Sequence, residues 1–466
     1  MISFVVNILV YMNKFEFTCI RFMLSLCLLS GMAADVCAAM ANNDRPEKKK
    51  AVPAIDFLNS MGVCVHIQHG EDASRMAPLL RYIGVRNVRD AADRNYDTSG
   101  LIRLHNDAGV KVAICVGSGA RDADLPAVLD MARRLHRAGA LLAIEGPNEP
   151  NNFGGVTYRG RSTAKDNTWM PVAEMQRDLY AAVKADSELC GYPVLGVSET
   201  GAQTDNTGLQ FLTVPSGTQC LMPEGTRFAD YLNVHNYMYH PSWQGLADNR
   251  VWMAADHTSA CRVDGLYGNH GLTWLKKFEG YSEEELATVP RVTTETGVRV
   301  GDSNGEVTEH VQACHYMNVY LAQFSRGWKH TFIYEMIDDG DGAFGFFHRD
   351  YTTPRLAAHA LHNMTILLAD SLSAPGDSLA YSLNTETDYV HDLLLRKHDG
   401  SFALVVWGER ASGSEKVTLR LGRSYAMEVF EPLVGTTPVA RREGRSLELE
   451  VSDHPLIILM SRQRLK

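Results

Sequence analysis

The sequence predicts an α/β protein, a (β/α)8 TIM barrel followed by a small C-terminal antiparallel β-sandwich. Strand-like apolar runs alternate with amphipathic, helix-like stretches over residues 55–370. Eight such runs are present, which is the strand count of a closed barrel. From residue 371 onward the pattern changes to period-two alternation interrupted by turn residues, which is typical of antiparallel strands.

Residues 1–41 are typical of an export signal. Lys14 and Arg21 precede an apolar run at residues 22–34, and Ala39 and Ala41 form an A-x-A arrangement after it. The run has about a dozen residues, fewer than the roughly 20 that a membrane-spanning helix needs. We therefore expect cleavage near Ala41, a secreted or periplasmic protein without stable membrane insertion, and a polar linker over residues 42–54.

The barrel is predicted over residues 55–370. Most of its helices are expected to end at glycine, which readily adopts the left-handed conformation of a helix C-cap. The segments 200–228 and 238–272 exceed ordinary loop lengths, so we expect them to shape a site. The predicted strands are 62–68, 85–90, 111–117, 141–147, 192–199, 231–238, 291–297 and 330–337, and the clearest helices are 74–84, 126–139, 172–185, 310–327 and 354–369.

Residues 371–466 are predicted to form the β-sandwich as an accessory domain. Apolar and polar residues alternate over 391–408, 415–422, 425–432, 446–453 and 455–461. Asp399 and Gly400 form a "DG" pair between two apolar runs, which is a hairpin signal.

Charge and cysteine content limit the partners of the chain. With 55 acidic and 45 basic residues the formal charge is -10, which argues against nucleic acid or an anionic membrane as a partner. No C-x-x-C pair occurs, so a cysteine zinc site is not supported, and we expect neither metal nor cofactor. Cys220 and Cys261 are the better candidates for a disulfide, although pairing among Cys190, Cys220 and Cys261 stays open.

Two glutamates end predicted strands. Glu149 follows the fourth strand and Glu295 ends the seventh. In a (β/α)8 barrel the carboxyl ends of all strands open onto one face, so both side chains should meet there. Two such carboxyl groups could flank a glycosidic bond, one donating a proton to the leaving oxygen and the other attacking the anomeric carbon. Retention of configuration needs a separation of about 5 to 5.5 Å.

Asn148, Glu149 and Pro150 form an "NEP" motif in register with the eight-strand pattern. In this respect the chain resembles the retaining glycoside hydrolases of clan A, with features of families 5 and 39, over residues 55–369. The resemblance implies that Glu149 is the acid/base and Glu295 the nucleophile. It also implies a poly- or oligosaccharide substrate, with the sugar, the linkage and endo or exo action left open.

The same resemblance implies roles for four further residues. Arg89 resembles the clan arginine that pairs with the nucleophile and keeps its pKa low, and it fits the strand register better than Arg86. His235 and Tyr237 are two apart on the sixth strand, hence on one face, and resemble residues that contact substrate and nucleophile. Asn148 is expected to bind the sugar 2-hydroxyl.

The eighth strand departs from the clan pattern. Many clan members end this strand with a Trp that forms the floor of a sugar subsite, whereas here the strand reads "FIYEMI". Tyr334 or Glu335 is expected to take that place. Trp243 lies in a long segment and is a candidate for stacking on a sugar face.

Other interpretations fit the sequence less well than the glycosidase. A metal-dependent hydrolase commonly uses an H-x-H pair on the first strand, but His66 and His69 are three apart and should point to opposite faces. Asp338, Asp339 and Asp341 could bind calcium, yet they lack the spacing of a recognised loop. A non-catalytic carbohydrate-binding or scaffold protein would need one of the two carboxylates to be absent, and both are present.

Overall fold

The computed structural model describes most of the chain from residue 45 onward. The described residues are 45–92, 96–116, 124–150, 156–166, 168, 170–198, 200–201, 225–237, 251–255, 282, 285, 288–302, 307–410 and 412–462. The predicted export signal, most of the two long segments, Trp243, Cys220 and Cys261 all lie outside these residues.

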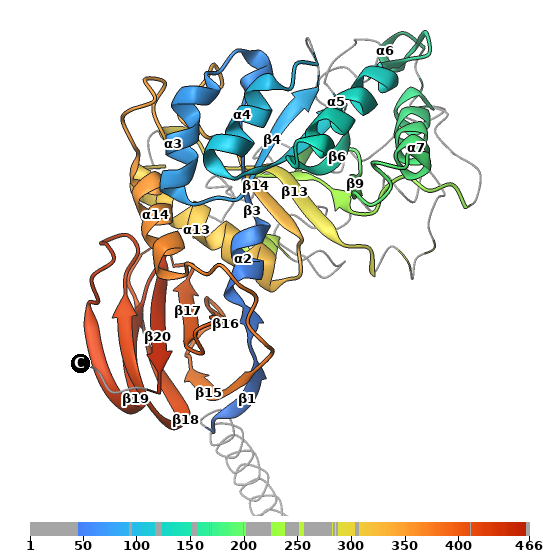
Figure 1. The fold of residues 1–466 in the computed structure, drawn as a ribbon. Coiled ribbons are helices and arrows are strands. Elements are labelled where there is room, and N and C mark those ends of the chain that lie inside the picture. The colour runs from blue at the N-terminus through green and yellow to red at the C-terminus, as the bar shows by residue number, and fades with distance from the viewer. Residues whose placement is uncertain are drawn as a thin grey trace, which may run out of the picture.

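Eight parallel strands form the barrel, in the hydrogen-bonded order β11-β13-β14-β3-β4-β5-β6-β9 (Figure 1). A bridge between Leu195 and Tyr231 joins the two ends of this order, and the Gly196 N–H donates to the Tyr231 carbonyl at 2.9 Å. The eight-stranded parallel barrel is therefore confirmed. The strands are β3 (Met61–Cys64), β4 (Asn87–Ala92), β5 (Lys111–Val116), β6 (Leu141–Pro147), β9 (Val194–Leu195), β11 (Leu232–Asn233), β13 (Arg291–Thr296) and β14 (His330–Ile333).

Helices surround the strands, and their ends follow local sequence signals. The Asp72 carboxylate accepts from the Ser74 and Arg75 N–H groups at the start of α3, and Gly84, at φ +74°, ends it. The described helices include α2 (Ala54–Ser60), α3 (Ala73–Ile83), α4 (Ser99–Ala108), α5 (Leu125–Arg137), α6 (Thr163–Asp166), α7 (Met170–Ala185), α9 (Val251–Ala254), α13 (Glu309–Ser325) and α14 (Leu356–Leu367), with the 3-10 turn η1 (Ile67–His69). Short strands β7 (Thr157–Tyr158), β8 (Arg161–Ser162), β10 (Thr200–Gly201) and β12 (His235–Asn236) complete this part of the chain.

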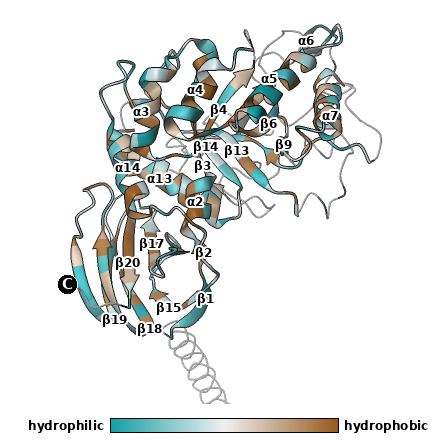
Figure 2. Cartoon of the chain, in the orientation of Figure 1, coloured by the Kyte–Doolittle hydropathy of each residue, from teal (hydrophilic) through white to brown (hydrophobic). Residues whose placement is uncertain are grey.

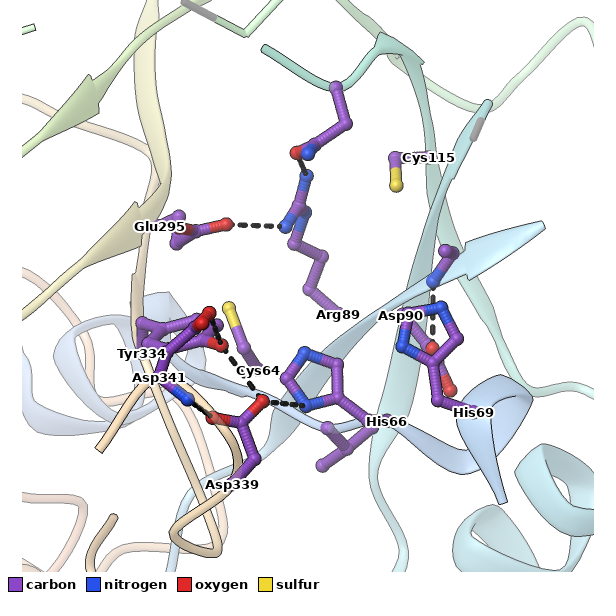
Figure 3. Close-up of a pocket in the computed structure, with 13 residues that line it drawn as sticks. Cys64, His66, His69, Arg89, Asp90, Cys115, Glu295, Tyr334, Asp339 and Asp341 are labelled. Carbon is purple, nitrogen blue, oxygen red and sulfur yellow. Dashed lines mark hydrogen bonds and ion pairs between the residues drawn. The ribbon is translucent and has the colours of Figure 1, made fainter. Parts of the chain in front are cut away.

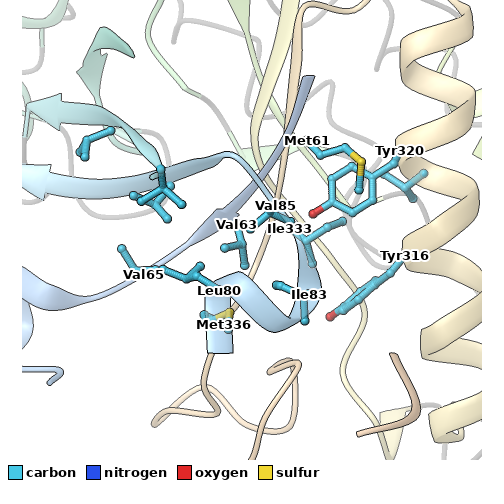
Figure 4. Packing of buried hydrophobic residues seen from close by; sticks show 14 of the residues in the cluster. Met61, Val63, Val65, Leu80, Ile83, Val85, Tyr316, Tyr320, Ile333 and Met336 are labelled. Carbon is cyan, nitrogen blue, oxygen red and sulfur yellow. The ribbon is translucent and has the colours of Figure 1, made fainter. Parts of the chain in front are cut away.

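Apolar side chains fill the space between the barrel wall and its helices. Figure 4 shows Val63 of β3 close to Leu80 and Ile83 of α3, with Tyr320 of α13 on the other side. The Tyr320 hydroxyl donates to the Gly62 carbonyl at 2.6 Å, so this buried tyrosine also satisfies its polar atom. A separate buried cluster from the strands includes Cys64, Ala113, Ala143, Leu195, Val292, Phe332 and Tyr334.

The C-terminal part is a sheet of eight strands that includes the N-terminal segment, and its strands pair antiparallel except β2, which pairs with β16 in parallel. Part of the segment expected as linker forms strands here, because β1 pairs with β15 and β2 pairs with β16. All described strands of this part are joined in one sheet, so two separate sheets are not seen. The strands are β1 (Glu47–Lys50), β2 (Val52–Pro53), β15 (Ser378–Asn384), β16 (Val390–Arg396), β17 (Phe402–Gly408), β18 (Glu415–Phe430), β19 (Ala440–Val451) and β20 (Pro455–Ser461).

The sheet packs against the barrel through a shared buried cluster that includes Trp407 and Leu395 of the sheet. Asn318 of α13 donates to the carbonyls of Gly408 at 3.2 Å and of Asp453 at 2.8 Å, which ties the helix to the sheet. Figure 2 shows β20 as largely hydrophobic and β1 as hydrophilic. None of the helices in the described residues is long and apolar enough to cross a membrane.

Candidate active site

Glu149 lies just beyond β6, on a backbone turn that the local sequence makes possible. A Cβ at Gly146 would lie 1.7 Å from Gln176 Oε1, so only glycine lets the strand pass this buried side chain. The Glu149 N–H donates to the Ser198 carbonyl at 2.8 Å. Glu149 itself has φ +42°, a left-handed conformation that is uncommon for a residue other than glycine and is enriched at functional sites.

Glu295 lies in β13 and receives two strong hydrogen bonds. Arg89 Nη1 donates to its Oε2 at 3.0 Å, and the Tyr237 hydroxyl donates to its Oε1 at 2.5 Å. Arg89 and Tyr237 were the residues expected to contact Glu295. Arg86, the alternative arginine, donates instead to Asn59 Oδ1 and to the backbone carbonyl of Asp370.

His235 lies between the two glutamates. Its Nδ1 is 2.6 Å from Glu149 Oε1 and 3.5 Å from Glu295 Oε2. One carboxylate oxygen of each glutamate and one nitrogen of His235 all lie within 4.8 Å of one another. His235 is fully buried, and its Nε2 is 3.0 Å from the Thr294 hydroxyl. The barrel therefore brings the two glutamates together at one mouth.

Glu145 is a site residue for which the sequence analysis predicted no role. It is fully buried, and its two oxygens accept from Arg89 Nε at 2.9 Å and Nη2 at 2.8 Å. Arg89 Nη2 also donates to Asn148 Oδ1 at 2.6 Å, and Thr294 donates to Glu145 at 3.0 Å. The strand period could have indicated this position. Glu145 is two residues after Ala143, which belongs to the buried cluster of the barrel strands, and alternate residues of a strand share a face.

Burial raises the pKa of the Glu295 carboxyl above its usual range. His235 lowers this pKa, the negative charge of Glu149 raises it, and Arg89 and the Tyr237 hydroxyl also lower it. Arg89 thus acts in the expected direction, but the net pKa is raised because desolvation outweighs it. Burial also raises the pKa of Tyr237 well above its usual value, so its hydroxyl remains a hydrogen-bond donor to the carboxylate.

A pocket opens beside Glu295, with Tyr334 at the end of β14 in its wall (Figure 3). The Tyr334 hydroxyl oxygen lies 3.1 Å from Asp339 Oδ2 and 2.9 Å from Asp341 Oδ2, so its one hydrogen is shared between the two carboxylates. Asp338 does not contact Tyr334 in this way, because its Oδ2 accepts a hydrogen bond from Arg355 Nη2 at 2.5 Å. The three aspartates considered for calcium therefore do not share one set of contacts.

His66 and His69 also line this pocket, and their expected orientation was wrong. Strand β3 ends at Cys64, and residues 67–69 form a 3-10 turn, which brings the two imidazole rings into a stack with centroids 5.4 Å apart. His66 Nδ1 lies 3.3 Å from Glu335 Oε2 and 3.7 Å from Asp339 Oδ2. These three residues could hold a cation, as could Glu149, His235 and Glu295.

Several acids near the pocket titrate far from their usual range because they are buried. Burial raises the pKa of Glu335 to about 11, with the charge of Asp339 adding to the shift. Burial also raises the pKa of Asp90 to about 8 and that of Glu71 to about 7, and it lowers the pKa of His66 to about 4. At neutral pH this side of the pocket is therefore less charged than its composition indicates.

Comparisons with known proteins show similarity of fold alone. No protein-family model and no curated protein matches the sequence. A family 39 glycoside hydrolase from Bacteroides cellulosilyticus WH2 is similar, with a TM-score of 0.53 and 15% identity over 88% of this chain and 81% of that chain. CelM2, a bifunctional glucanase-xylanase from a metagenome library, gives a TM-score of 0.52 and 12% identity over 90% of this chain and 99% of that chain. The expected resemblance to glycoside hydrolases of clan A is thereby confirmed for the fold.

Proposed function

We propose that the protein is a retaining glycoside hydrolase that cleaves a poly- or oligosaccharide by double displacement. The observation that carries the proposal is the pair of carboxylates at the barrel mouth, in which one oxygen of Glu149 lies within 4.8 Å of one oxygen of Glu295. That spacing favours the separation of about 5 to 5.5 Å of retaining enzymes over the roughly 6.5 to 9.5 Å of inverting ones. The shared fold with glycoside hydrolases is consistent with this chemistry.

The contacts of each glutamate support its proposed role. Glu295 takes hydrogen bonds from Arg89 and Tyr237, both of which stabilise a carboxylate, so it is the nucleophile. In the first step its oxygen bonds to the anomeric carbon, the glycosidic bond breaks, and Glu149 gives its proton to the leaving oxygen. In the second step Glu149 takes a proton from water, the water oxygen attacks the anomeric carbon, and Glu295 is released.

The hydrogen-bond network also favours a proton on Glu149 at the start. The Thr294 hydroxyl donates its hydrogen to the Glu145 carboxylate. Its oxygen therefore accepts a hydrogen bond from His235 Nε2, which we assign as the protonated ring nitrogen. The other ring nitrogen, Nδ1, is then an acceptor and is 2.6 Å from Glu149, as a protonated carboxyl requires.

Asn148 and Arg89 are proposed to support the sugar and the nucleophile. Asn148 Oδ1 accepts from Arg89, which aims the amide N–H groups of Asn148 away from the guanidinium and leaves them for the sugar 2-hydroxyl. Tyr334 lines the pocket beside Glu295 and is proposed to take the place of the clan tryptophan. The proposed role of Trp243 in stacking rests on the sequence.

The decisive experiment compares the two glutamates with a panel of aryl glycosides. Glu149→Ala removes the proton donor, so a substrate with a good leaving group should still form the glycosyl-enzyme, and azide should restore turnover with retention. Glu295→Ala removes the nucleophile, so no covalent intermediate should form, and any azide product should be inverted. Labelling of Glu149 by a mechanism-based fluoro-sugar, or of neither residue in an active enzyme, would contradict the assignment.

The second candidate is a non-catalytic carbohydrate-binding or scaffold protein with the same fold. Full-length wild-type protein that binds polysaccharide but hydrolyses no glycoside of the panel would favour it. Glu295→Gln is the matched variant, because it nearly preserves the shape of the side chain while removing its charge. Under the glycosidase proposal this variant loses turnover and keeps sugar binding.

We also propose that the protein is exported and acts in the periplasm or outside the cell. Export suits a polymeric substrate, which does not readily enter a cell, and residues 1–41 have the pattern of a signal. Mass spectrometry of protein recovered outside the cytoplasm should find an N-terminus near Asn42. Recovery of the intact N-terminus there would contradict cleavage.

A further inference from the structure

A second cluster of reactive side chains lies where α13 meets the turn between β19 and β20. His310 and Cys314 are four residues apart on α13, and Asp453 lies in the turn. One donor atom of each residue lies within 4.8 Å of the other two. None of the three residues lines the pocket beside Glu295.

The distances within this cluster are those of converging donor atoms. Cys314 Sγ is 3.5 Å from His310 Nε2, and the same nitrogen is 2.7 Å from Asp453 Oδ2. Cys314 is buried, with 1% of its surface exposed, whereas the His310 side chain is 50% exposed. The cluster therefore has a buried thiol at its base and an opening to solvent beside the imidazole.

Secondary structure holds the donors in place. Residues four apart on a helix lie on one face, so His310, Cys314 and Asn318 line up along α13. Asn318 donates to the backbone carbonyl of Asp453 at 2.8 Å, which fixes the turn against this face. The contacts therefore join an element of the barrel to an element of the C-terminal sheet.

A neighbouring histidine orients the Asp453 carboxylate from the side opposite His310. Its Oδ1 is 2.7 Å from His454 Nδ1, and His454 Nε2 is 3.0 Å from Glu431 Oε1. This arrangement leaves Oδ2 facing His310. Outer hydrogen bonds of this kind orient the ligands of metal sites.

We propose that His310, Cys314 and Asp453 bind one zinc ion, which links the barrel to the C-terminal sheet. Sulfur, nitrogen and oxygen are the donor types of protein zinc sites. Bonds of about 2.3 Å to sulfur and about 2.0 to 2.1 Å to nitrogen at a tetrahedral angle separate the two donors by about 3.6 Å. The sulfur and nitrogen donors are 3.5 Å apart here.

Zinc replaces protons when it binds this cluster. His310 Nε2 and Asp453 Oδ2 are 2.7 Å apart and share a hydrogen. On zinc binding this hydrogen leaves Nε2 and the exposed Nδ1 takes up a proton from solvent, so the ligand is a neutral imidazole, while the thiol proton goes to solvent and the two ligands move apart. No bond other than these breaks, and no change of oxidation state is involved. Water completes the coordination on the solvent side, beside the exposed imidazole.

Cobalt(II) substitution tests the proposal in the full chain after chelator treatment. Thiolate ligation gives a sulfur-to-cobalt charge-transfer band, which carboxylate and imidazole ligands do not produce. We expect this band to saturate near about one equivalent of metal and to disappear on addition of zinc. Cys314→Ser should abolish the band, whereas the matched variant Cys190→Ser, which removes an exposed thiol, should retain it.

Two further results decide the case if Cys314→Ser fails to fold. His310→Gln changes a half-exposed side chain and should weaken zinc affinity at least about tenfold, and zinc should raise the Tm of the wild type but not of this variant. Absence of the band in the wild type, its persistence in Cys314→Ser, its loss in Cys190→Ser, or unchanged affinity in His310→Gln would each overturn the proposal. These readouts do not use glycoside turnover, so they are independent of the proposed glycosidase activity.

Discussion

Replacing Glu145 by glutamine should destabilise the barrel, because this carboxylate is the bidentate partner of a buried arginine. Glu145 is fully buried and Arg89 is 6% exposed, and two hydrogen bonds of 2.9 and 2.8 Å join them. Removing one partner of a buried ion pair costs about 3 to 5 kcal/mol. Arg89 keeps its bonds to Glu295 and Asn148, so we expect a loss near the lower end, about 3 kcal/mol.

Thermal unfolding followed by circular dichroism would measure this loss. A change of about 3 kcal/mol should lower Tm by roughly 6 to 12 °C, at about 2 to 4 °C per kcal/mol. Asp107→Asn is the matched control, because Asp107 pairs with Arg103 at the surface, where the side chains are 44% and 58% exposed. That exposed i,i+4 pair should contribute only about 0.3 to 0.5 kcal/mol.

A double-mutant cycle then isolates the contact itself. The double variant Arg89→Gln, Glu145→Gln should lose less stability than the sum of the two single variants. Each single variant leaves one member of the ion pair buried without its partner, whereas the double variant removes both charges. Glu145→Gln should also reduce kcat/KM, since it removes the carboxylate that aims Arg89 at Glu295. A Tm for Glu145→Gln no lower than that of the Asp107→Asn control would refute the reasoning.

Two further predictions concern the pH profile and the backbone at the site. Tyr237→Phe removes a hydrogen bond that lowers the pKa of Glu295, and since Glu295 must be ionised to attack, the acid limb of kcat/KM should move to higher pH; an unmoved limb would separate Tyr237 from the nucleophile. Gly146→Ala places a Cβ 1.7 Å from Gln176 Oε1 and should cost about 1 to 3 kcal/mol in urea unfolding, whereas Gly191→Ala, with open space around the new Cβ, should cost far less. Equal effects of the two glycine changes would contradict the packing argument.

The linear sequence was sufficient to predict the barrel, because its signals are local. Apolar runs, helix caps and glycines set strands and helices within a few residues, and the count of eight strands leaves few arrangements. The carboxyl ends of barrel strands meet on one face, so Glu149 was expected beside Glu295 although the two residues are 146 positions apart in the sequence. Arg89 and Tyr237 followed from the clan resemblance and the strand register.

The tertiary structure decided what depends on contacts between distant segments. Residues 47–50 were expected as a polar linker because all four side chains are charged, yet their backbone pairs with β15. All four side chains are exposed in this strand, so the segment lacks the apolar alternation that marks a strand in the sequence. His66 and His69 were assigned to opposite faces on a strand period, but the strand stops at Cys64 and the turn stacks their rings. The ion pair of Glu145 with Arg89, and the approach of Cys314 to Asp453, join residues that no local pattern relates. Such contacts depend on three-dimensional proximity and low local dielectric, which arise only when the chain has folded.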